Sequence, residues 1–197
     1  MTIIVHRVNT IEKLKTIPSD FGVEIDVRHD NRTGRLYLNH DPGDGKDLEE
    51  YLKNFHHSFI IFNIKEAGIE QACLNLATTY NLPPTSFFLL DVEFPYLYKA
   101  SRQKGIKNIA VRYSEAEPIE MTLTQKGFVE WVWIDVNTKL PLNANIVEEL
   151  KGFKTCLVSP ECWGRPEDIK KYTDEMKNLN FTPNAVMCDF EYIEEWK

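Results

Sequence analysis

Eight short apolar runs, spaced along the whole chain and mostly separated by stretches of helical character, constrain the fold more than any other feature. Several are nearly continuous in Val, Ile, Leu and Phe, as expected for parallel strands that are buried on both faces. The runs lie at residues 2–6, 22–28, 59–65, 87–91, 108–114, 129–135, 155–160 and 185–189. Strands that alternate with helices predict a protein of the α/β class with a parallel sheet.

The helical stretches are recognised by their capping residues and by the spacing of their apolar residues. Residues 47–55 begin at an aspartate, residues 66–81 carry an apolar stripe, and residues 165–180 begin near a proline followed by acidic residues. These features are typical of amphipathic helices. Shorter helices are expected near residues 11–16 and 191–196.

The number of strands indicates how the sheet is arranged. Eight strand–helix units in 197 residues predict a compact (β/α)₈ TIM barrel, which forms a single domain over residues 1–197. An open, doubly wound sheet is the alternative, because a strand count alone does not exclude it. No GxGxxG or GxxxxGK[ST] sequence follows an early strand, so neither dinucleotide binding nor Walker-type phosphate binding is supported.

Charge and composition exclude several classes of partner. The formal net charge is −7 and there is no block of lysine or arginine, so a nucleic-acid partner is not expected. No apolar run approaches the roughly 18 residues that a membrane span needs. The four cysteines form no CxxC pair, and the first apolar stretch ends at His6 and Arg7, unlike a signal peptide. A cytoplasmic protein with reduced thiols is expected.

The run at 22–28 combines an apolar face with a charged one that carries Glu24 and Asp26. If this strand is central, both carboxylates point into the barrel, where they repel one another unless a cation lies between them. An E-x-D pair offers hard oxygen ligands for Mg²⁺ or Ca²⁺. An exposed edge strand with solvated charges is the alternative explanation of the same pattern.

Other ionisable residues also lie at the ends of the predicted strands, and functional side chains of barrels gather at the carboxyl ends. Arg28 and Lys65 would suit a bound phosphate anion. His6 and His40 could move protons. Asp91 could add a further carboxylate.

Four motifs in the first third of the chain together resemble the glycerophosphodiester phosphodiesterases, a family of (β/α)₈ barrels. They are "IIVHR" (3–7), "GVEIDVR" (22–28), "LYLNHD" (36–41) and "FNIK" (62–65). Three departures are visible. Val8 stands where the family has a glycine, the P-E-N-T that usually follows is shortened to "VNT" (8–10), and Asn63 stands where the family has a third carboxylate. A short, divergent member of the family is expected.

The resemblance implies roles for individual residues. His6 and His40 would be the acid/base pair of phosphodiester cleavage. Glu24 and Asp26 would bind a divalent cation, with Asn63 offering a neutral oxygen in place of the third carboxylate. The cationic side chains expected to contact the phosphate are Arg7, Arg28, Lys65 and Arg112.

The expected function is therefore the hydrolysis of a small glycerol- or polyol-type phosphodiester, assisted by a divalent cation such as Mg²⁺ or Ca²⁺. The missing third carboxylate supports an alternative, a barrel that has lost turnover and acts as a binding or regulatory module. An unrelated metal-dependent hydrolase of the same architecture is a third possibility, and it would act on esters or amides.

Overall fold

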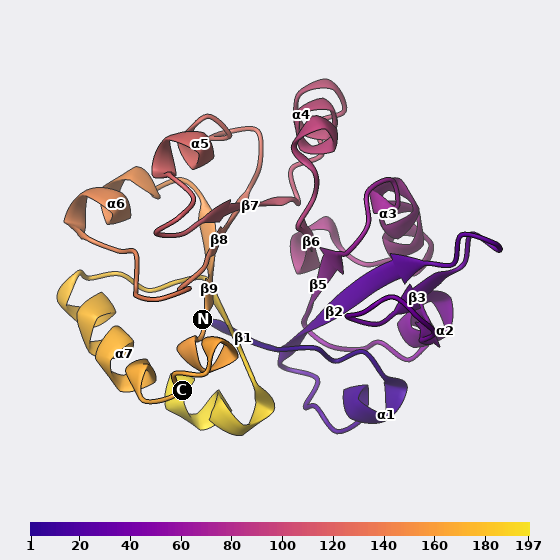
Figure 1. The fold of residues 1–197 in the computed structure, drawn as a ribbon, viewed down its shortest axis with the longest axis horizontal. Coiled ribbons are helices and arrows are strands. Elements are labelled where there is room, and N and C mark those ends of the chain that lie inside the picture. The colour runs from indigo at the N-terminus through magenta and orange to yellow at the C-terminus, as the bar shows by residue number, and fades with distance from the viewer.

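The computed structural model, which describes residues 1–197, is a closed barrel of parallel strands with helices around its outside (Figure 1). Ten strands form the sheet. All except β3 and β4 belong to the barrel, which consists of β1 (Thr2–Val5), β2 (Gly22–His29), β5 (Phe59–Ile64), β6 (Phe87–Leu90), β7 (Ala110–Tyr113), β8 (Trp131–Ile134), β9 (Lys154–Val158) and β10 (Ala185–Cys188). The predicted TIM barrel is confirmed, and all the strand predictions fall on these elements.

The ring closes where the first and last strands meet and where β6 approaches β7. β1 pairs in parallel with β10 on one side and with β2 on the other. The closure between β6 and β7 is weaker, because it consists of one bridge between Leu89 and Ile109, supported by a 3.0 Å hydrogen bond from Leu89 N to Asn108 O. The doubly wound alternative is thereby excluded.

A small antiparallel extension departs from the end of β2. β2 pairs with β3 (Leu36–Leu38), and β3 pairs with β4 (Lys46–Asp47). The turn between β2 and β3 contains Gly34, whose φ of 73° lies in the left-handed region that glycine adopts without strain. This extension holds the segment that carries His40 beside the barrel mouth.

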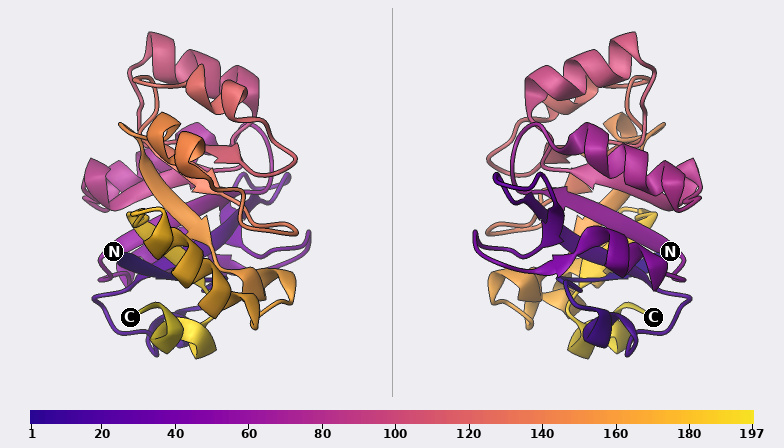
Figure 2. Two further views of the ribbon diagram at one scale, coloured as in Figure 1. Left: turned by 90° about the vertical axis from the view of Figure 1, so that its left-hand side faces the viewer. Right: turned by 90° about the vertical axis from the view of Figure 1, so that its right-hand side faces the viewer.

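Helices cover the outside of the barrel, as the two side views show (Figure 2). Their bounds are α1 (Ile11–Leu14), α2 (Leu48–Lys53), α3 (Glu70–Thr79), α4 (Phe94–Gln103), α5 (Ile119–Leu123), α6 (Ala144–Glu149) and α7 (Asp168–Asn178), with 3₁₀ turns η1 (Pro84–Ser86), η2 (Pro160–Trp163) and η3 (Phe190–Trp196). The helices predicted from the sequence are confirmed with shorter bounds, except that the last one is the 3₁₀ turn η3. α4, α5 and α6 were not predicted.

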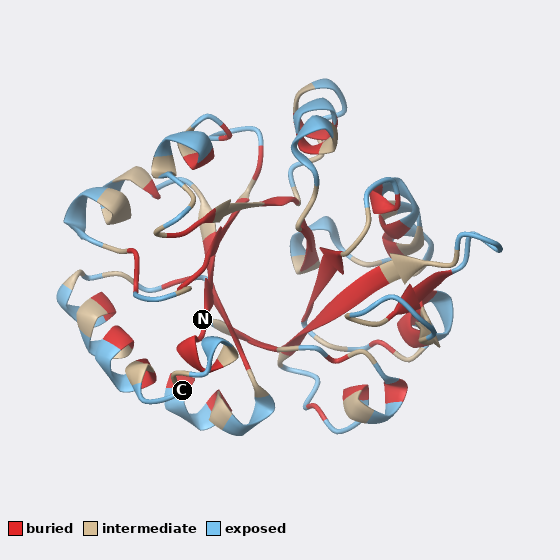
Figure 3. Cartoon of the chain, viewed as in Figure 1, coloured by how far each residue is buried: buried red, intermediate tan, exposed pale blue.

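The barrel strands are largely buried (Figure 3), and the alternation of side chains along them gives two apolar layers. One cluster of 41 buried residues packs between the strands and the helices. A second cluster of 12 fills the barrel interior and includes Phe88, Trp131 and Trp133. Both tryptophans are buried in this cluster, and Trp133 also lines the cavity at the barrel mouth. No helix is long and apolar enough to cross a membrane.

Phe88 is the central aromatic residue of the interior cluster. Its side chain is fully buried, and its ring centroid lies 4.8 Å from that of Trp131 and 5.7 Å from that of Phe59. Phe88→Ala should lower the free energy of unfolding by about 3–5 kcal/mol, because the rigid barrel cannot collapse around the void. Urea denaturation measures this change. A loss below about 1 kcal/mol would contradict the described packing of the interior.

Candidate functional site

A cavity of about 310 Å³ opens at the carboxyl ends of the strands. Seven of the nine residues predicted from the sequence line it, namely His6, Arg7, Glu24, His40, Asn63, Lys65 and Arg112. Asp26 is fully buried and reaches the cavity through its ion pair with Lys65. Arg28 is the one predicted residue with no place in this group. The charged face of β2 therefore points into the barrel, and the exposed-edge interpretation is wrong.

His6 follows the end of β1, and its ring is held by Asp189 at the end of β10. The His6 Nδ1 atom lies 2.9 Å from Asp189 Oδ1. A carboxylate can only accept a hydrogen bond, so Nδ1 carries the proton and Nε2 keeps its lone pair. This hydrogen bond holds the pKa of Asp189 below its usual range. The arrangement leaves His6 with a proton-accepting nitrogen that has no partner within the protein.

Glu24 lies at the base of the cavity and is held by two donors. Its Oε1 accepts a hydrogen bond of 2.8 Å from Asn63 Nδ2, and its Oε2 accepts one of 2.8 Å from the backbone N–H of Arg7. Arg7 has a φ of 51°, a left-handed conformation that turns its N–H towards Glu24. Val8, which replaces the family's glycine, is fully buried. Burial, and next the charge of Asp26, raise the pKa of Glu24.

Asp26 lies deeper and is neutralised by Lys65. Lys65 Nζ lies 3.0 Å from Asp26 Oδ1, while Asn9 Nδ2 donates a 2.8 Å hydrogen bond to Asp26 Oδ2. Asn9 Oδ1 in turn accepts the backbone N–H of Asp26 at 2.8 Å. Asn9 therefore ties the loop after β1 to β2 and fixes the orientation of the carboxylate.

The donor set at the base of the cavity fits a divalent cation of the Mg²⁺ or Ca²⁺ type. Glu24, Asp26 and Asn63 together offer carboxylate and amide oxygens, which are the hard ligands that these ions prefer. One of these buried oxygens, Asn63 Oδ1, receives no hydrogen bond, whereas Asp26 Oδ1 is paired with Lys65 Nζ at 3.0 Å. A cation would give Asn63 Oδ1 the positive partner that it lacks.

His40 lies on the antiparallel extension at the edge of the cavity, and Arg28 holds the backbone of His40 in place. Arg28 donates hydrogen bonds from Nε and Nη2 to the backbone oxygen of His40, at 3.0 and 2.8 Å, and from Nη1 to Glu66 at 3.0 Å. All three donor nitrogens are thus engaged outside the cavity. The structure does not bring Arg28 to the predicted phosphate position, because β2 has turned away from the barrel there to pair with β3.

Arg112 reaches the cavity from β7 and is clamped between two carboxylates. It bonds Asp91 through Nε and Nη2, at 2.6 and 3.0 Å, and Asp135 through Nη1 at 2.5 Å. Asp135 also accepts a 2.7 Å hydrogen bond from the indole N–H of Trp163. Asp91 therefore pairs with Arg112, and it does not complete the ligand set around Asn63.

Asp189, the partner of His6, is the main functional candidate to which sequence reasoning gave no role, although it lies at the end of a predicted strand. It is supported by Glu161, whose Oε1 accepts the backbone N–H of Asp189 at 3.1 Å. Glu161 in turn accepts from Ser159, and Ser159 Oγ accepts a 2.8 Å hydrogen bond from the Trp196 indole. The position of Asp189 could have indicated this role. It directly follows the eighth barrel strand, which lies beside the first strand when the barrel closes, and His6 follows that first strand.

Comparisons with known proteins agree with this architecture. No protein-family model matches the sequence, and no curated protein matches it. Among solved structures, a phosphodiesterase from Oleispira antarctica in complex with the product sn-glycerol-3-phosphate superposes with a TM-score of 0.64, 15% identity and coverage of 95% of this chain and 92% of that chain. A glycerophosphodiester phosphodiesterase from Agrobacterium tumefaciens gives a TM-score of 0.63, 13% identity and coverage of 95% and 96%.

A third solved structure, a glycerophosphoryl diester phosphodiesterase from Parabacteroides distasonis, gives a TM-score of 0.58 with 11% identity, over 94% of this chain and 81% of that chain. The resemblance first found in four motifs thus extends to the fold of nearly the whole chain. The chain has the barrel fold of these solved phosphodiesterases, at 11–15% identity.

Proposed function

We propose that this protein is a phosphoric diester hydrolase that cleaves a small glycerol- or polyol-type phosphodiester in the cavity at the barrel mouth. One observation carries the proposal. A histidine with a free Nε2, a second histidine, a carboxylate and a lysine line the same cavity. The named solved structures of this fold are phosphodiesterases by description, and one holds sn-glycerol-3-phosphate.

Cleavage of a phosphodiester needs two proton transfers. In the proposed reaction, His6 Nε2 takes the proton of the attacking hydroxyl, which belongs to water or to a neighbouring group of the substrate. The new P–O bond forms as the bond to the leaving alcohol breaks, and His40 gives the leaving oxygen a proton. Asp189 stabilises the imidazolium that forms on His6. His6 is assigned the role of base because its Nδ1 is held by Asp189 and its Nε2 is free, and His40, the other histidine of the cavity, is assigned the role of acid.

The non-bridging oxygens of the phosphate need positive charge as negative charge builds up in the transition state. Lys65 and Arg112 line the cavity and would supply that charge while ion-paired with Asp26 and with Asp91 and Asp135, and Arg7 extends from the loop after β1. A divalent cation held by Glu24, Asp26 and Asn63 would act as a Lewis acid on the phosphoryl oxygens. Arg28 takes no part in phosphate binding here, and it positions His40 through the backbone.

The proposal is tested with purified protein, added Mg²⁺, Ca²⁺ or Mn²⁺, and a panel of glycerophosphodiesters with different alcohols. Release of the alcohol is expected for at least one member. Matched phosphomonoesters, carboxylic esters and amides serve as controls and should not react. Cleavage of esters or amides alone would favour the third possibility, an unrelated hydrolase on the same barrel.

Divalent-cation binding should depend on Asp26. We expect calorimetric titration of the wild type to show micromolar binding of one of the three ions, and Asp26→Ala to weaken it more than ~100-fold, because one of only two carboxylate ligands is lost. Asp20→Ala, which alters an exposed carboxylate before β2, should bind like the wild type. Equal binding by wild type and Asp26→Ala would place the ion elsewhere.

A second candidate, a barrel that binds without turnover, is favoured by Asn63 and Lys65. Asn63 Nδ2 donates to Glu24, and Lys65 already neutralises Asp26, so these contacts balance the acidic pair without a cation. Wild-type protein that binds no ion at millimolar concentration and cleaves no diester, yet retains glycerol 3-phosphate, would favour this candidate over the hydrolase.

A further inference from the structure

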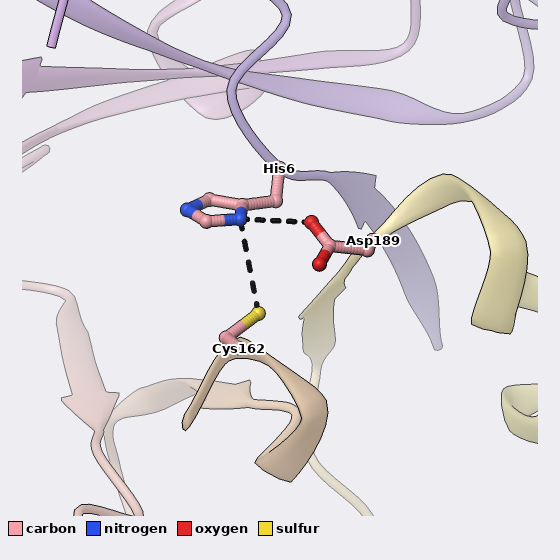
Figure 4. Close-up of side chains that lie close together, drawn as sticks. All are labelled: His6, Cys162 and Asp189. Carbon is pink, nitrogen blue, oxygen red and sulfur yellow. Dashed lines mark hydrogen bonds and ion pairs between the residues drawn. The ribbon is translucent and has the colours of Figure 1, made fainter. Parts of the chain in front are cut away.

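His6, Cys162 and Asp189 converge at the barrel mouth from three separate elements (Figure 4). His6 follows β1, Cys162 lies in η2 after β9, and Asp189 follows β10. Each residue offers one ligand atom, and these three atoms all lie within 4.8 Å of one another. The sulfur of Cys162 lies 3.9 Å from His6 Nδ1, on the same side of the ring as Asp189. Cys162 is also the one cysteine that is not buried.

These three donors differ in kind from the oxygens around Glu24. A thiolate, an imidazole nitrogen and a carboxylate form the donor set that Zn²⁺ and related thiophilic ions prefer, whereas Mg²⁺ and Ca²⁺ select oxygen. Typical zinc bonds of about 2.3 Å to sulfur and about 2.0–2.2 Å to nitrogen and oxygen place tetrahedral neighbours about 3.4–3.6 Å apart. The separations of 3.9 Å and 2.9 Å from His6 Nδ1 to the sulfur and to the Asp189 oxygen need shifts of roughly half an ångström or less. The sulfur and the Asp189 oxygen lie within 4.8 Å of one another and would have to approach by up to about 1.3 Å.

We propose that His6, Cys162 and Asp189 form a second metal site, selective for Zn²⁺ and similar thiophilic divalent ions, with one coordination position left open to the cavity. On binding, the His6 proton moves through solvent from Nδ1 to Nε2, the Cys162 thiol releases its proton to solvent, and Nδ1 and the thiolate form bonds to the ion, while Asp189 exchanges its hydrogen bond for a metal bond. No oxidation or reduction takes place. The site is distinct from the oxygen site at the base of the cavity, with which it shares no ligand.

Such an ion would inhibit the enzyme. Coordination through Nδ1 leaves the imidazole proton on Nε2, so Nε2 has no lone pair with which to accept a proton, and Asp189 no longer stabilises an imidazolium. This consequence rests on the proposed function, whereas binding of the ion does not. Diester cleavage by this protein should therefore be supported by Mg²⁺ or Ca²⁺ and inhibited by added Zn²⁺.

Co²⁺ is the probe that reports the site directly, because a thiolate ligand gives a near-ultraviolet charge-transfer band and a tetrahedral site gives intense visible bands. Titration of the full-length reduced protein with Co²⁺ should show both bands, and added Zn²⁺ should abolish them. Cys162→Ser should lack the thiolate band and should bind Zn²⁺ more than ~100-fold more weakly, since a ligand is lost. Asp189→Asn should weaken Zn²⁺ binding in the same direction.

Two controls keep the result specific. His40→Ala removes a histidine from the same cavity but from outside the cluster, so its Co²⁺ spectrum should match that of the wild type. Circular dichroism checks that each variant is folded. If Cys162→Ser does not fold, Cys162→Ala takes its place. Absence of a thiolate band at saturating Co²⁺, or a band that persists without Cys162, overturns the proposal. Neither result would bear on diester cleavage, which is measured separately.

Discussion

Replacing His6 by alanine should lower kcat for the cleaved glycerophosphodiester by about 10²–10⁴-fold, the usual contribution of one positioned acid or base. His6 is the candidate base because its Nδ1 is fixed on Asp189 and its Nε2 has no partner in the protein. The protein should remain folded, since the side chain is not part of the buried core. Steady-state kinetics with the substrate found in the panel measure the loss.

His40→Ala should produce a loss of similar size, because the leaving alkoxide would lack its proton donor. A substrate with an acidic leaving group such as p-nitrophenol needs less protonation, so it should suffer less from this variant than from His6→Ala. His56→Ala, at an exposed histidine before β5 and therefore at the opposite end of the barrel, should keep full activity. Equal losses for both leaving groups would remove His40 from the role of acid.

Asp189→Asn should also lower kcat by about 10²–10⁴-fold, although the change removes only one charge. An asparagine amide can donate to His6 Nδ1, which forces the imidazole proton onto Nε2 and removes the free lone pair that serves as base. The expected signature is a loss in kcat with little change in KM. A comparable change in KM alone would show that Asp189 binds substrate and does not orient His6.

The same variant has a pH signature. The pKa of Asp189 lies below its usual range chiefly because of the His6 hydrogen bond. The stability that this pairing gives the folded protein is therefore fully present above the ordinary aspartate pKa of about 3.9. It is lost as the pH falls through the lower pKa that Asp189 has in the folded protein. Asp189→Asn should be less sensitive than wild type to acid over that range. The comparison is made by measuring the thermal unfolding of both proteins between about pH 5 and pH 2.5, a range around that ordinary pKa. Unfolding temperatures that fall in parallel for wild type and Asp189→Asn would contradict the pairing of Asp189 with His6.

The barrel and the acidic face of β2 could be predicted because both follow from local patterns. Continuous apolar runs such as β5 and β6 indicate strands buried on both sides. The alternation around Glu24 and Asp26 places both carboxylates on one face, and a central strand must turn that face inward. Helices α5 and α6 were missed because each spans about one turn and a half, too short to show a 3.6-residue period.

The partners of the site residues could not be predicted, because they come from distant parts of the chain. Asp189 lies 183 residues from His6, and only closure of the ring brings the ends of β1 and β10 together. Arg28 and Arg112 were both expected at the phosphate. Arg28 is engaged by the His40 backbone outside the cavity, whereas Arg112 lines the cavity with its guanidinium held by Asp91 and Asp135. A sequence shows where a charge lies along a strand, but not which opposite charge the fold brings to it.

Asn63 is the residue that most distinguishes this site from the family pattern. It removes one negative charge beside Glu24 and supplies a hydrogen-bond donor in its place. The acidic pair therefore repels less when no cation is present, and a bound divalent ion would be held less tightly than by three carboxylates. Asn63→Asp should raise the affinity for Mg²⁺ or Ca²⁺. The same calorimetric titration that is used for Asp26→Ala can measure this change.

The central claim is that the cavity around His6, Glu24, His40 and Lys65 breaks a phosphodiester. Phosphorus-31 NMR of the purified protein with a glycerophosphodiester and a divalent ion follows the phosphorus atom itself. We predict that the diester signal is replaced by a phosphomonoester or a cyclic phosphate in the wild type and persists with His6→Ala. A diester signal that stays unchanged with the wild type for the whole panel, or that disappears equally fast with His6→Ala, would contradict the claim.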